Sequence, residues 1–423
     1  MQRLFVSENR RGFVTEDGKP FFWLGDTAWE LFHKLSIEQT EHYFKTRKEQ
    51  GFNVIQAVLL GEEWGLTAPN FYGRIPLCDC DPERPDLAGE YNYWDHVKAV
   101  IELAERYNLY IAVLPTWGDK INLLWGKEKE IFDGDNAFAY GKFVGKLLGG
   151  YKNIVWIMGG DRVMTKHRHF RVLNQMAAGL KEGEKEVHIM SFHPPGGSTS
   201  TANNADADWL DFVMWQTGHN ARELKVHESI RQDWDAEVIR PVLNAEPCYE
   251  DHPINQSPEL GYFDEYDVRE AAYRSVLAGG CGHTYGHHCV WYFAKENQIA
   301  ERFLMSWEEA LERPAAKQMQ YVRKLMENYD FIHRKPADDR VVNQLEGANY
   351  IVGTEGENYA LFYTPNGVRF QLDLRDIHKE ITAKWYDPRT GTDSKEFKLK
   401  GGIISFAPPV KGRLYDSVLC LAF

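Results

Sequence analysis

The sequence lacks several features that mark common classes of protein. No apolar run reaches the roughly 20 residues of a membrane-spanning helix, and the first residues, MQRLFVSENRRGF, lack the basic start and apolar core of a signal peptide. We therefore expect a cytoplasmic protein with no membrane partner. The six cysteines in 423 residues form no CxxC pair and no dense framework, which indicates free thiols rather than disulfides.

Positive charge is also scarce. The chain has 62 Asp and Glu against 49 Lys and Arg, a net charge of -13, and no local basic patch interrupts this balance. Such a chain repels phosphate backbones and anionic lipids, so we expect no nucleic-acid partner. Aromatic residues, by contrast, are abundant, with 13 Trp, 21 Tyr and 23 Phe. They suit stacking on sugar rings, and they equally suit a large hydrophobic core.

Short apolar runs alternate with amphipathic segments over residues 20–330. The eight runs are FFWLGDTA (21–28), FNVIQAVLL (52–60), YIAVLPTW (110–117), NIVWIMGGD (153–161), VHIMSFH (187–193), DFVMWQTGH (211–219), PVLNAEPCY (241–249) and GHTYGHHCVW (282–291). The helical segments between them are 36–50, which opens with an S-x-x-Q capping box, 94–107, 138–148, 170–180, 223–234 and 268–277. This alternation predicts the α/β class, with a (β/α)8 TIM barrel over residues 1–334.

The pattern changes to closely spaced short strands near the end of the chain. TPNGV supplies an Asn-Gly turn between two of these strands, and DPRTG supplies another turn. We therefore predict a small antiparallel β-sandwich over residues 335–423. We expect it to support the barrel and to leave the barrel mouth open, since its strands carry no cluster of acids.

Two carboxylates close apolar runs at the positions where a barrel places its active site. Asp161 follows Gly159 and Gly160 on the fourth run, and Glu246 follows Ala245 on the seventh. Strands four and seven face each other across a barrel mouth. Paired carboxylates about 5–5.5 Å apart cleave a glycosidic bond with retention, and about 6.5–9.5 Å apart with inversion. We expect the retaining spacing, with the apolar residues before Asp161 raising its pKa as a general acid requires.

Other polar and aromatic residues near strand ends are candidates for substrate binding. Asp26 and Trp29 would bind sugar hydroxyls and stack on a sugar ring, and the alternatives are a helix cap and a core Trp. The long loop of residues 61–90 has the composition of a binding loop, and the alternative is a surface insertion. The remaining candidates are Gln56, Trp117, His193, Gln216, His219, Tyr249, His283, Tyr285 and His287.

The stretch CGHTYGHHC, residues 281–289, raises the question of a metal site. In an extended strand Cys281 and Cys289 lie too far apart to reach one ion. We expect hydrogen bonds from His283, Tyr285 and His287 to the substrate or to Glu246 instead, and we expect neither a metal nor another cofactor.

Several motifs taken together resemble glycoside hydrolase family 140, an apiosidase-like group of the cellulase-like clan with a C-terminal sandwich named for collagen binding. They are FFWLGDTAWELFHKL, GFNVIQ, NIVWIMGGD, LNAEPCYE, GGCGHTYGHHCVW and KWYDPRTG, and the resemblance covers nearly the whole chain. It implies Asp161 as acid/base, Glu246 as nucleophile, and the β-apiosyl linkage of pectic rhamnogalacturonan II as substrate type. The long second loop and the absent signal peptide favour a small imported glycoside over pectin.

The leading hypothesis is a retaining, exo-acting glycosidase that removes a terminal β-linked sugar, with apiose a candidate, from a plant-derived oligosaccharide or glycoside. One alternative is a non-catalytic carbohydrate- or collagen-binding protein, which has no need of both barrel acids. Another is a metal-dependent hydrolase that uses the cluster at residues 281–289, which a chelator would inactivate. The sequence leaves the sugar, the aglycone and the oligomeric state open.

Overall fold

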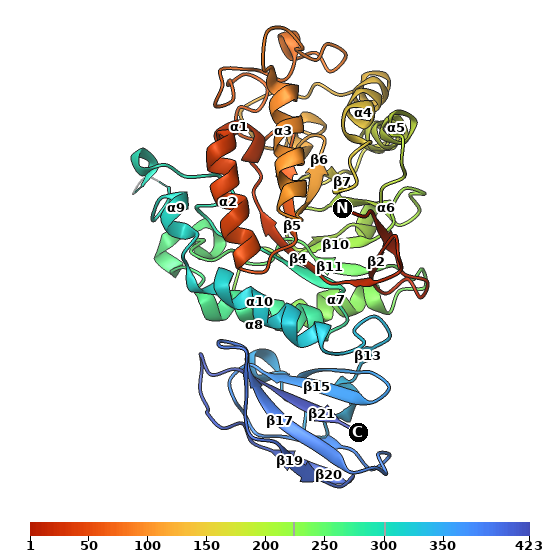
Figure 1. Cartoon of the computed structure of the whole chain (residues 1–423), viewed down its shortest axis with the longest axis vertical. Helices are drawn as coiled ribbons and strands as arrows, with labels where there is room; N and C mark the ends of the chain where they lie inside the picture. The colour runs from red at the N-terminus through yellow and green to blue at the C-terminus, as the bar shows by residue number, and fades with distance from the viewer. Residues whose placement is uncertain (223–224, 300–301) are drawn as a thin grey trace.

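Eight parallel strands form a barrel in the computed structural model of the chain, which describes residues 1–222, 225–299 and 302–423 (Figure 1). They run in the order β8-β7-β6-β5-β4-β12-β11-β10, and β9 (Ser198–Thr199) adds an antiparallel edge to β10. The amide of Asp211 donates to the carbonyl of Met190 at 2.9 Å, so the first and last strands nearly close the ring. The barrel strands are β4 (Trp23–Thr27), β5 (Val54–Val58), β6 (Tyr110–Leu114), β7 (Ile154–Gly159), β8 (Met190–His193), β10 (Val213–Gln216), β11 (Val242–Asn244) and β12 (Gly282–Tyr285).

Each predicted apolar run contributes one barrel strand, because parallel strands that are buried on both faces are continuously apolar. Their side chains fill the barrel interior with a packed core that includes Val54, Ala112, Val155 and Met214. The predicted fold class is therefore confirmed.

Helices surround the barrel. The predicted capping box is present at Ser36, whose hydroxyl accepts from the amide of Gln39 at 3.2 Å while the Gln39 side chain accepts from the Ser36 amide at 3.0 Å. The predicted helix at 223–234 begins at Val226, and residues 223–224 lie outside the described residues. The helices are α1 (Leu31–Lys34), α2 (Ile37–Glu49), α3 (Tyr93–Arg106), α4 (Gly134–Leu148), α5 (His167–Gly183), α6 (Thr201–Asn204), α7 (Val226–Trp234), α8 (Glu265–Leu277), α9 (Trp307–Ala310) and α10 (Pro314–Glu327).

The fifth strand–helix unit departs from the regular pattern. The chain between β8 and β10 forms only the four-residue α6 and the edge strand β9, with no long helix in this described segment. No helix in the described ranges is long and apolar enough to span a bilayer.

A small N-terminal sheet covers the end of the barrel where the strands begin. It consists of β1 (Leu4–Val6), β2 (Phe13–Thr15) and β3 (Pro20–Phe21). The ring of Phe13 packs 5.8 Å from Trp23 and 5.1 Å from Phe212. This end is therefore filled by side chains, and the opposite end, where the strands finish, is left for a site.

The C-terminal region is an antiparallel β-sandwich, as predicted. The larger sheet packs against α8 and α10, at the lower side of the barrel in Figure 1, and contributes Tyr359, Leu361 and Tyr363 to a shared hydrophobic core. Its strands are β13 (Lys335–Pro336), β14 (Val352–Glu355), β15 (Tyr359–Thr364), β21 (Ser417–Ala422), β17 (Ile381–Asp387), β18 (Thr392–Asp393) and β19 (Phe397–Leu399), and the smaller sheet pairs β16 (Phe370–Asp373) with β20 (Ile403–Phe406).

Candidate active site

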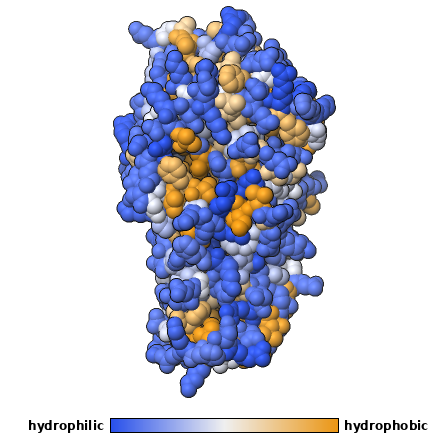
Figure 2. Space-filling model, turned by 90° about the vertical axis from the view of Figure 1, so that its right-hand side faces the viewer, coloured by the Kyte–Doolittle hydropathy of each residue, from blue (hydrophilic) through white to orange (hydrophobic). Residues whose placement is uncertain are grey.

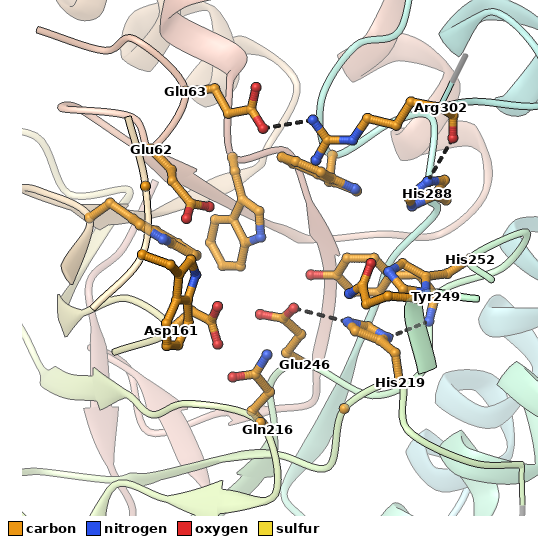
Figure 3. A pocket seen from close by; sticks show the side chains of 18 of the residues that line it. Glu62, Glu63, Asp161, Gln216, His219, Glu246, Tyr249, His252, His288 and Arg302 are labelled. Atoms are coloured by element: carbon orange, nitrogen blue, oxygen red, sulfur yellow. Dashed lines mark hydrogen bonds and ion pairs between the residues drawn. The ribbon is translucent and has the colours of Figure 1, made fainter. Parts of the chain in front are cut away.

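A pocket of about 520 Å³ opens where the barrel strands end (Figure 3). This volume is typical of small-molecule sites. No lining residue belongs to the C-terminal sandwich, so the mouth stays open as expected. Seven of the predicted site residues line the pocket: Trp29, Trp117, Asp161, Gln216, His219, Glu246 and Tyr249.

Two glycines set the direction of Asp161 at the end of β7. Gly159 and Gly160 have φ angles of +83° and +119°, and Asp161 itself has φ +45°. A Cβ on Gly159 would lie 2.4 Å from the ring of Phe192, and a Cβ on Gly160 would lie 2.7 Å from the ring of Trp117. Only glycine fits this turn. The turn directs the Asp161 carboxyl into the pocket, toward Glu246 (Figure 3).

Glu246 follows β11 and is held by the neighbouring strand and by two histidines. Its amide donates to the carbonyl of Trp215 at 3.2 Å. Nε2 of His219 lies 3.2 Å from Oε1 of Glu246, and Nδ1 of the same ring accepts from the Tyr249 amide at 3.3 Å. Since Nδ1 is an acceptor, the ring proton is on Nε2 and is donated to the carboxylate.

His193 supplies the second contact to Glu246. Its Nε2 atom lies 2.8 Å from Oε2 of Glu246, although the angle is poor for a straight hydrogen bond. Burial alone would raise the pKa of Glu246, but the contacts of His193 and His219 outweigh burial and hold this pKa well below its ordinary range. Glu246 is therefore ionised.

Asp161 has the opposite electrostatic character. Burial and, next, the negative charge of Glu246 raise the pKa of Asp161 to about 7, against the opposing effects of His193 and Arg162. Near neutral pH a substantial fraction of Asp161 is therefore protonated while Glu246 is charged. Two carboxyl groups in one pocket with divided pKa values are the arrangement that general acid catalysis beside a nucleophile requires.

Two predicted substrate-binding residues from β4 and β5 lie below the pocket instead of lining it. Asp26 is fully buried and accepts from Arg47 at 2.6 Å and from the hydroxyl of Tyr43 at 2.5 Å. It is a buried ion-pair residue, which corrects the expectation that it binds sugar hydroxyls. Gln56, also fully buried, donates to the carbonyl of Ala245 at 3.0 Å and so supports the strand end that carries Glu246.

The residues predicted around β12 also lie outside the pocket lining. Tyr285 donates to Glu250 at 2.7 Å, and His287 contacts Asp251 at 3.1 Å. His283 is fully buried, has no hydrogen-bond partner at either ring nitrogen, and has a pKa lowered to about 3 by burial. Contacts from these side chains to Glu246 or to substrate were expected, and this is corrected because β12 ends at Tyr285 and the following turn packs against residues 250–251.

No set of three or more potential metal ligands converges anywhere in the described ranges, residues 281–289 included. In this stretch Tyr285 contacts Glu250, His287 contacts Asp251 and His288 contacts the carbonyl of Arg302, while the His283 ring has no hydrogen-bond partner.

Loops after six strands supply pocket residues that the sequence did not single out. Glu62 and Glu63 begin the predicted binding loop of residues 61–90, and Arg302 binds Glu63 at 2.6 Å while Arg162 binds Glu62. An acidic pair directly after the second apolar run was the available signal for them. The other lining residues that the sequence did not identify are Trp125, Gly126, Lys127, Gly196, Gly218, Asn220, His252, Gln256, His288 and Trp291.

A buried lysine fixes the start of this loop. Lys120 donates to the carbonyl of Gly61 at 2.6 Å and contacts Asp119 and Glu128 at 3.0 Å each. Glu128 in turn accepts from the amide of Thr67 at 3.1 Å. The loops after β5 and β6 are therefore joined beneath the pocket rim.

Two family profiles match the chain. Residues 7–333 match the profile described as "Apiosidase-like, catalytic domain", and residues 336–422 match "Putative collagen-binding domain of a collagenase". No curated protein matches it.

Solved structures of similar architecture agree with these profiles. One, described as "Glycoside hydrolase", has 29% sequence identity and a TM-score of 0.91, over 100% of this chain and 97% of its own. A glycoside hydrolase described as family 5, from Bacteroides vulgatus ATCC 8482, has 29% identity and a TM-score of 0.91, over 99% and 93%. An endo-1,4-beta-D-mannanase from Thermotoga petrophila RKU-1 has 11% identity and a TM-score of 0.52, over 72% and 100%, and shares the fold.

Proposed function

The chain belongs to the apiosidase-like family and is a glycoside hydrolase that acts on carbohydrate, and from this premise we propose a retaining, exo-acting mechanism. Glu246 is the nucleophile and Asp161 the acid/base. The substrate is a terminal β-linked sugar, with apiose a candidate, on a plant-derived oligosaccharide or glycoside. The observation that carries the proposal is the division of the two pKa values within one pocket.

The first half of the reaction uses both acids in the states that their surroundings favour. A carboxylate oxygen of Glu246 attacks C1 of the sugar while Asp161 gives its proton to the glycosidic oxygen. The bond between C1 and this oxygen breaks, the aglycone leaves as an alcohol, and the sugar remains as an ester on Glu246.

The second half reverses the role of Asp161. Esterification removes the negative charge of Glu246, which is one of the causes that raise the pKa of Asp161. The pKa of Asp161 therefore falls in the intermediate, and its carboxylate can take a proton from water. That water attacks C1, the sugar leaves with its original anomeric configuration, and Glu246 is restored.

Unpartnered polar groups in the pocket wall can hold a sugar. The indole nitrogen of Trp117, the hydroxyl of Tyr249 and Oε1 of Gln216 are buried and have no protein hydrogen-bond partner. The rings of Trp29 and Trp117 lie 5.0 Å apart. His252 is neutral, with a pKa lowered to about 2 by burial, and its Nδ1 lies 2.7 Å from the Pro253 carbonyl, which leaves Nε2 as an acceptor. This set suits the hydroxyls of one sugar ring.

Ion pairs at the rim support removal of a terminal sugar. Glu63 with Arg302 and Glu62 with Arg162 join loops from different strands around the pocket. Such bridges favour a closed pocket over an open cleft for a long chain. A non-catalytic binder would have no need for two carboxyl groups in opposite protonation states.

The test combines a substrate panel with the stereochemistry of the product. We expect release of a free monosaccharide from a 4-nitrophenyl β-glycoside or an apiosylated flavonoid, and proton NMR at early times should show the β anomer first. Appearance of the α anomer first would contradict the retaining mechanism. Release of oligosaccharides from internal linkages would contradict exo action.

A further inference from the structure

A fully buried arginine lies directly beside the proposed general acid. Nη1 of Arg162 donates to the backbone carbonyl of Asp161 at 2.9 Å, but it lies 3.4 Å from Oδ2 of the same residue. A guanidinium in full contact with a buried carboxyl group strongly favours the ionised carboxylate. Such a contact would oppose the protonated state that Asp161 needs at the start of the reaction.

Glu62 takes the stronger contact with this guanidinium. Its Oε1 accepts a short hydrogen bond from Nη2 of Arg162, and the same nitrogen donates to the carbonyl of Trp125 at 3.0 Å. The guanidinium also lies over the ring of Trp125, 3.9 Å from its centroid. Arg162 is therefore drawn toward the loops after β5 and β6, and its ion pair with Oδ2 of Asp161 stays long, at 3.4 Å.

The backbone at Glu62 is itself fixed by the buried side chain of Lys120. The buried amine of Lys120 donates to the carbonyl of Gly61 at 2.6 Å and lies 3.5 Å from the carbonyl of Glu62. The side chain of Glu62 is 25% exposed and lines the pocket.

We propose that Glu62 is a positioning residue that draws the guanidinium of Arg162 to itself, keeps the contact of Arg162 with the Asp161 carboxyl group long, and so keeps this acid able to donate its proton. The inference rests on the proposed role of Asp161. The charged and titratable groups that face Asp161 are Glu246 from the loop after β11, His193 from the end of β8, Glu62 from the loop after β5, and Arg162 beside it. Among these, Arg162 is the permanent cation, and the distance of its guanidinium from the Asp161 carboxyl group decides how strongly it lowers the pKa of Asp161.

The central variant is Glu62→Gln, which keeps the shape of the side chain and removes its charge. Arg162 should then turn toward Asp161 and lower its pKa. We expect the alkaline limb of the pH profile of kcat/KM on an alkyl glycoside, whose leaving group needs a proton, to move down by about one pH unit, which is a tenfold loss of kcat/KM above the limb. The 4-nitrophenyl glycoside of the same sugar, whose leaving group needs no proton, should lose less activity.

Glu63→Gln is the matched control. It removes the same charge from the next residue of the same loop, but Glu63 binds Arg302 and lies 3.6 Å from Lys127, not Arg162. Its alkaline limb should stay where the wild-type limb lies. An equal shift in both variants would show a general charge effect and would overturn the inference.

A second variant pair tests whether the effect passes through Arg162. Arg162→Met alone should move the alkaline limb upward, and adding Glu62→Gln to it should produce a smaller downward shift than Glu62→Gln produces in the wild type, because only the direct effect of the Glu62 charge on Asp161 remains. An equal downward shift in both backgrounds would overturn the inference. Thermal melting confirms folding, and Arg162→Gln, which also removes the positive charge, replaces the Met variant if the latter does not fold. An unchanged limb in Glu62→Gln, or a rise in KM alone, would overturn the inference and make Glu62 a substrate contact.

One more measurement separates this inference from the proposed function. Asp161→Asn should lose far more activity on the alkyl glycoside than on the nitrophenyl glycoside. If both substrates lose activity equally, Asp161 is not the acid and the assigned role is wrong. If the loss is selective for the alkyl glycoside but Glu62→Gln does not shift the alkaline limb, only the role of Glu62 is wrong.

Discussion

At the scale of single residues, Asp161 and Glu246 differ in what surrounds them, and the difference predicts how their variants behave. Glu246→Ala removes the nucleophile and should abolish activity. Azide can occupy the space left by the side chain and attack C1, giving a glycosyl azide of inverted configuration. Asp161→Ala should retain turnover on nitrophenyl glycosides, whose leaving group needs no proton. Product analysis by NMR measures both outcomes.

With azide, Asp161→Ala should give a glycosyl azide of retained configuration, because the ester on Glu246 still forms. If Asp161→Ala gave the inverted azide instead, the roles of the two acids would have to be exchanged.

The histidine pair around Glu246 leads to a second prediction. His219→Phe keeps a ring that can stack on His252, which now lies 4.3 Å away, but it removes the N–H that is donated to Glu246. Loss of this donor should raise the pKa of Glu246, so the acidic limb of kcat/KM should move to higher pH. We expect this limb to move up by about one pH unit, measured on a nitrophenyl glycoside.

His288→Phe is the control for this variant. Its Nε2 lies 3.3 Å from the carbonyl of Arg302, so it lines the same pocket without a hydrogen bond to Glu246. Its acidic limb should match that of the wild type. Equal limbs in His219→Phe and the wild type would show that His219 does not control the ionisation of Glu246.

Asp26 shows why residue roles are only partly predictable. Asp26 and Asp161 both lie near the ends of apolar runs of the sequence, and the sequence predicted a place in the active site for both. Asp26 is neutralised by Arg47, which reaches it from α2, and this partner is set by tertiary packing rather than by neighbouring residues. Asp161 carried a local signal in Gly159 and Gly160, whose turn directs it into the pocket.

At the scale of elements, the sequence predicts the barrel strands well and the loops poorly. A buried parallel strand needs a continuous apolar run, so each strand can be recognised from its own residues alone. The contacts of residues 61–90 depend on Lys120 and Glu128, which lie in another loop. The short α6 replaces a full crossover helix, and the sequence between β8 and β10 showed no helical pattern there.

The turn after β7 carries a prediction about backbone shape. Gly160→Ala places a Cβ 2.7 Å from the ring of Trp117, at a φ angle that side chains rarely adopt. Asp161 should be displaced, and kcat should fall by about a hundredfold, since an error near 1 Å in a catalytic group has this order of effect. Kinetics on a nitrophenyl glycoside measure the loss.

Gly150→Ala is its matched control. This glycine lies before β7, and a Cβ there would have no atom within 4 Å. Its kcat should equal that of the wild type. Wild-type activity in Gly160→Ala would show that the turn tolerates a side chain and does not set the position of Asp161.

The junction of the loops after β5 and β6 predicts a loss of stability. Lys120→Met leaves Asp119 and Glu128 without the amine that lies 3.0 Å from each, in a place where the Lys120 and Asp119 side chains are fully buried. Breaking a buried pair on one side costs about 3–5 kcal/mol. We expect the melting temperature to fall by about 6 °C or more, measured by calorimetry.

Lys129→Met, a change at an exposed lysine of the same loop, is the comparison and should melt within about 1 °C of the wild type. A Lys120→Met protein as stable as this one would mean that the buried triad does not hold the two loops together.

At the scale of the whole molecule, charge and packing divide the surface from the interior. The chain carries a net charge of -13, and Figure 2 shows one face largely covered by hydrophilic residues, with apolar residues in small groups. The larger sheet of the sandwich is instead joined to the barrel through a shared core at α8 and α10. The strand pattern predicted the sandwich but did not locate this contact.

A buried ion pair fixes the sandwich to the barrel and gives the last prediction. Arg269 of α8 donates to Asp416 at 2.6 and 2.9 Å, both side chains are at most 1% exposed, and the hydroxyl of Tyr363 donates to Asp416 at 3.1 Å. Asp416→Asn leaves a buried guanidinium without a counter-charge, which costs about 3–5 kcal/mol. Calorimetry should therefore show a clearly lower melting temperature. At temperatures below this melting temperature kcat should be unchanged, because the sandwich does not line the pocket.

Asp373→Asn is the control for this variant. It breaks the exposed pair with Arg375 and should melt like the wild type. Equal melting of the two variants would mean that the Arg269–Asp416 pair adds nothing to the docking of the sandwich.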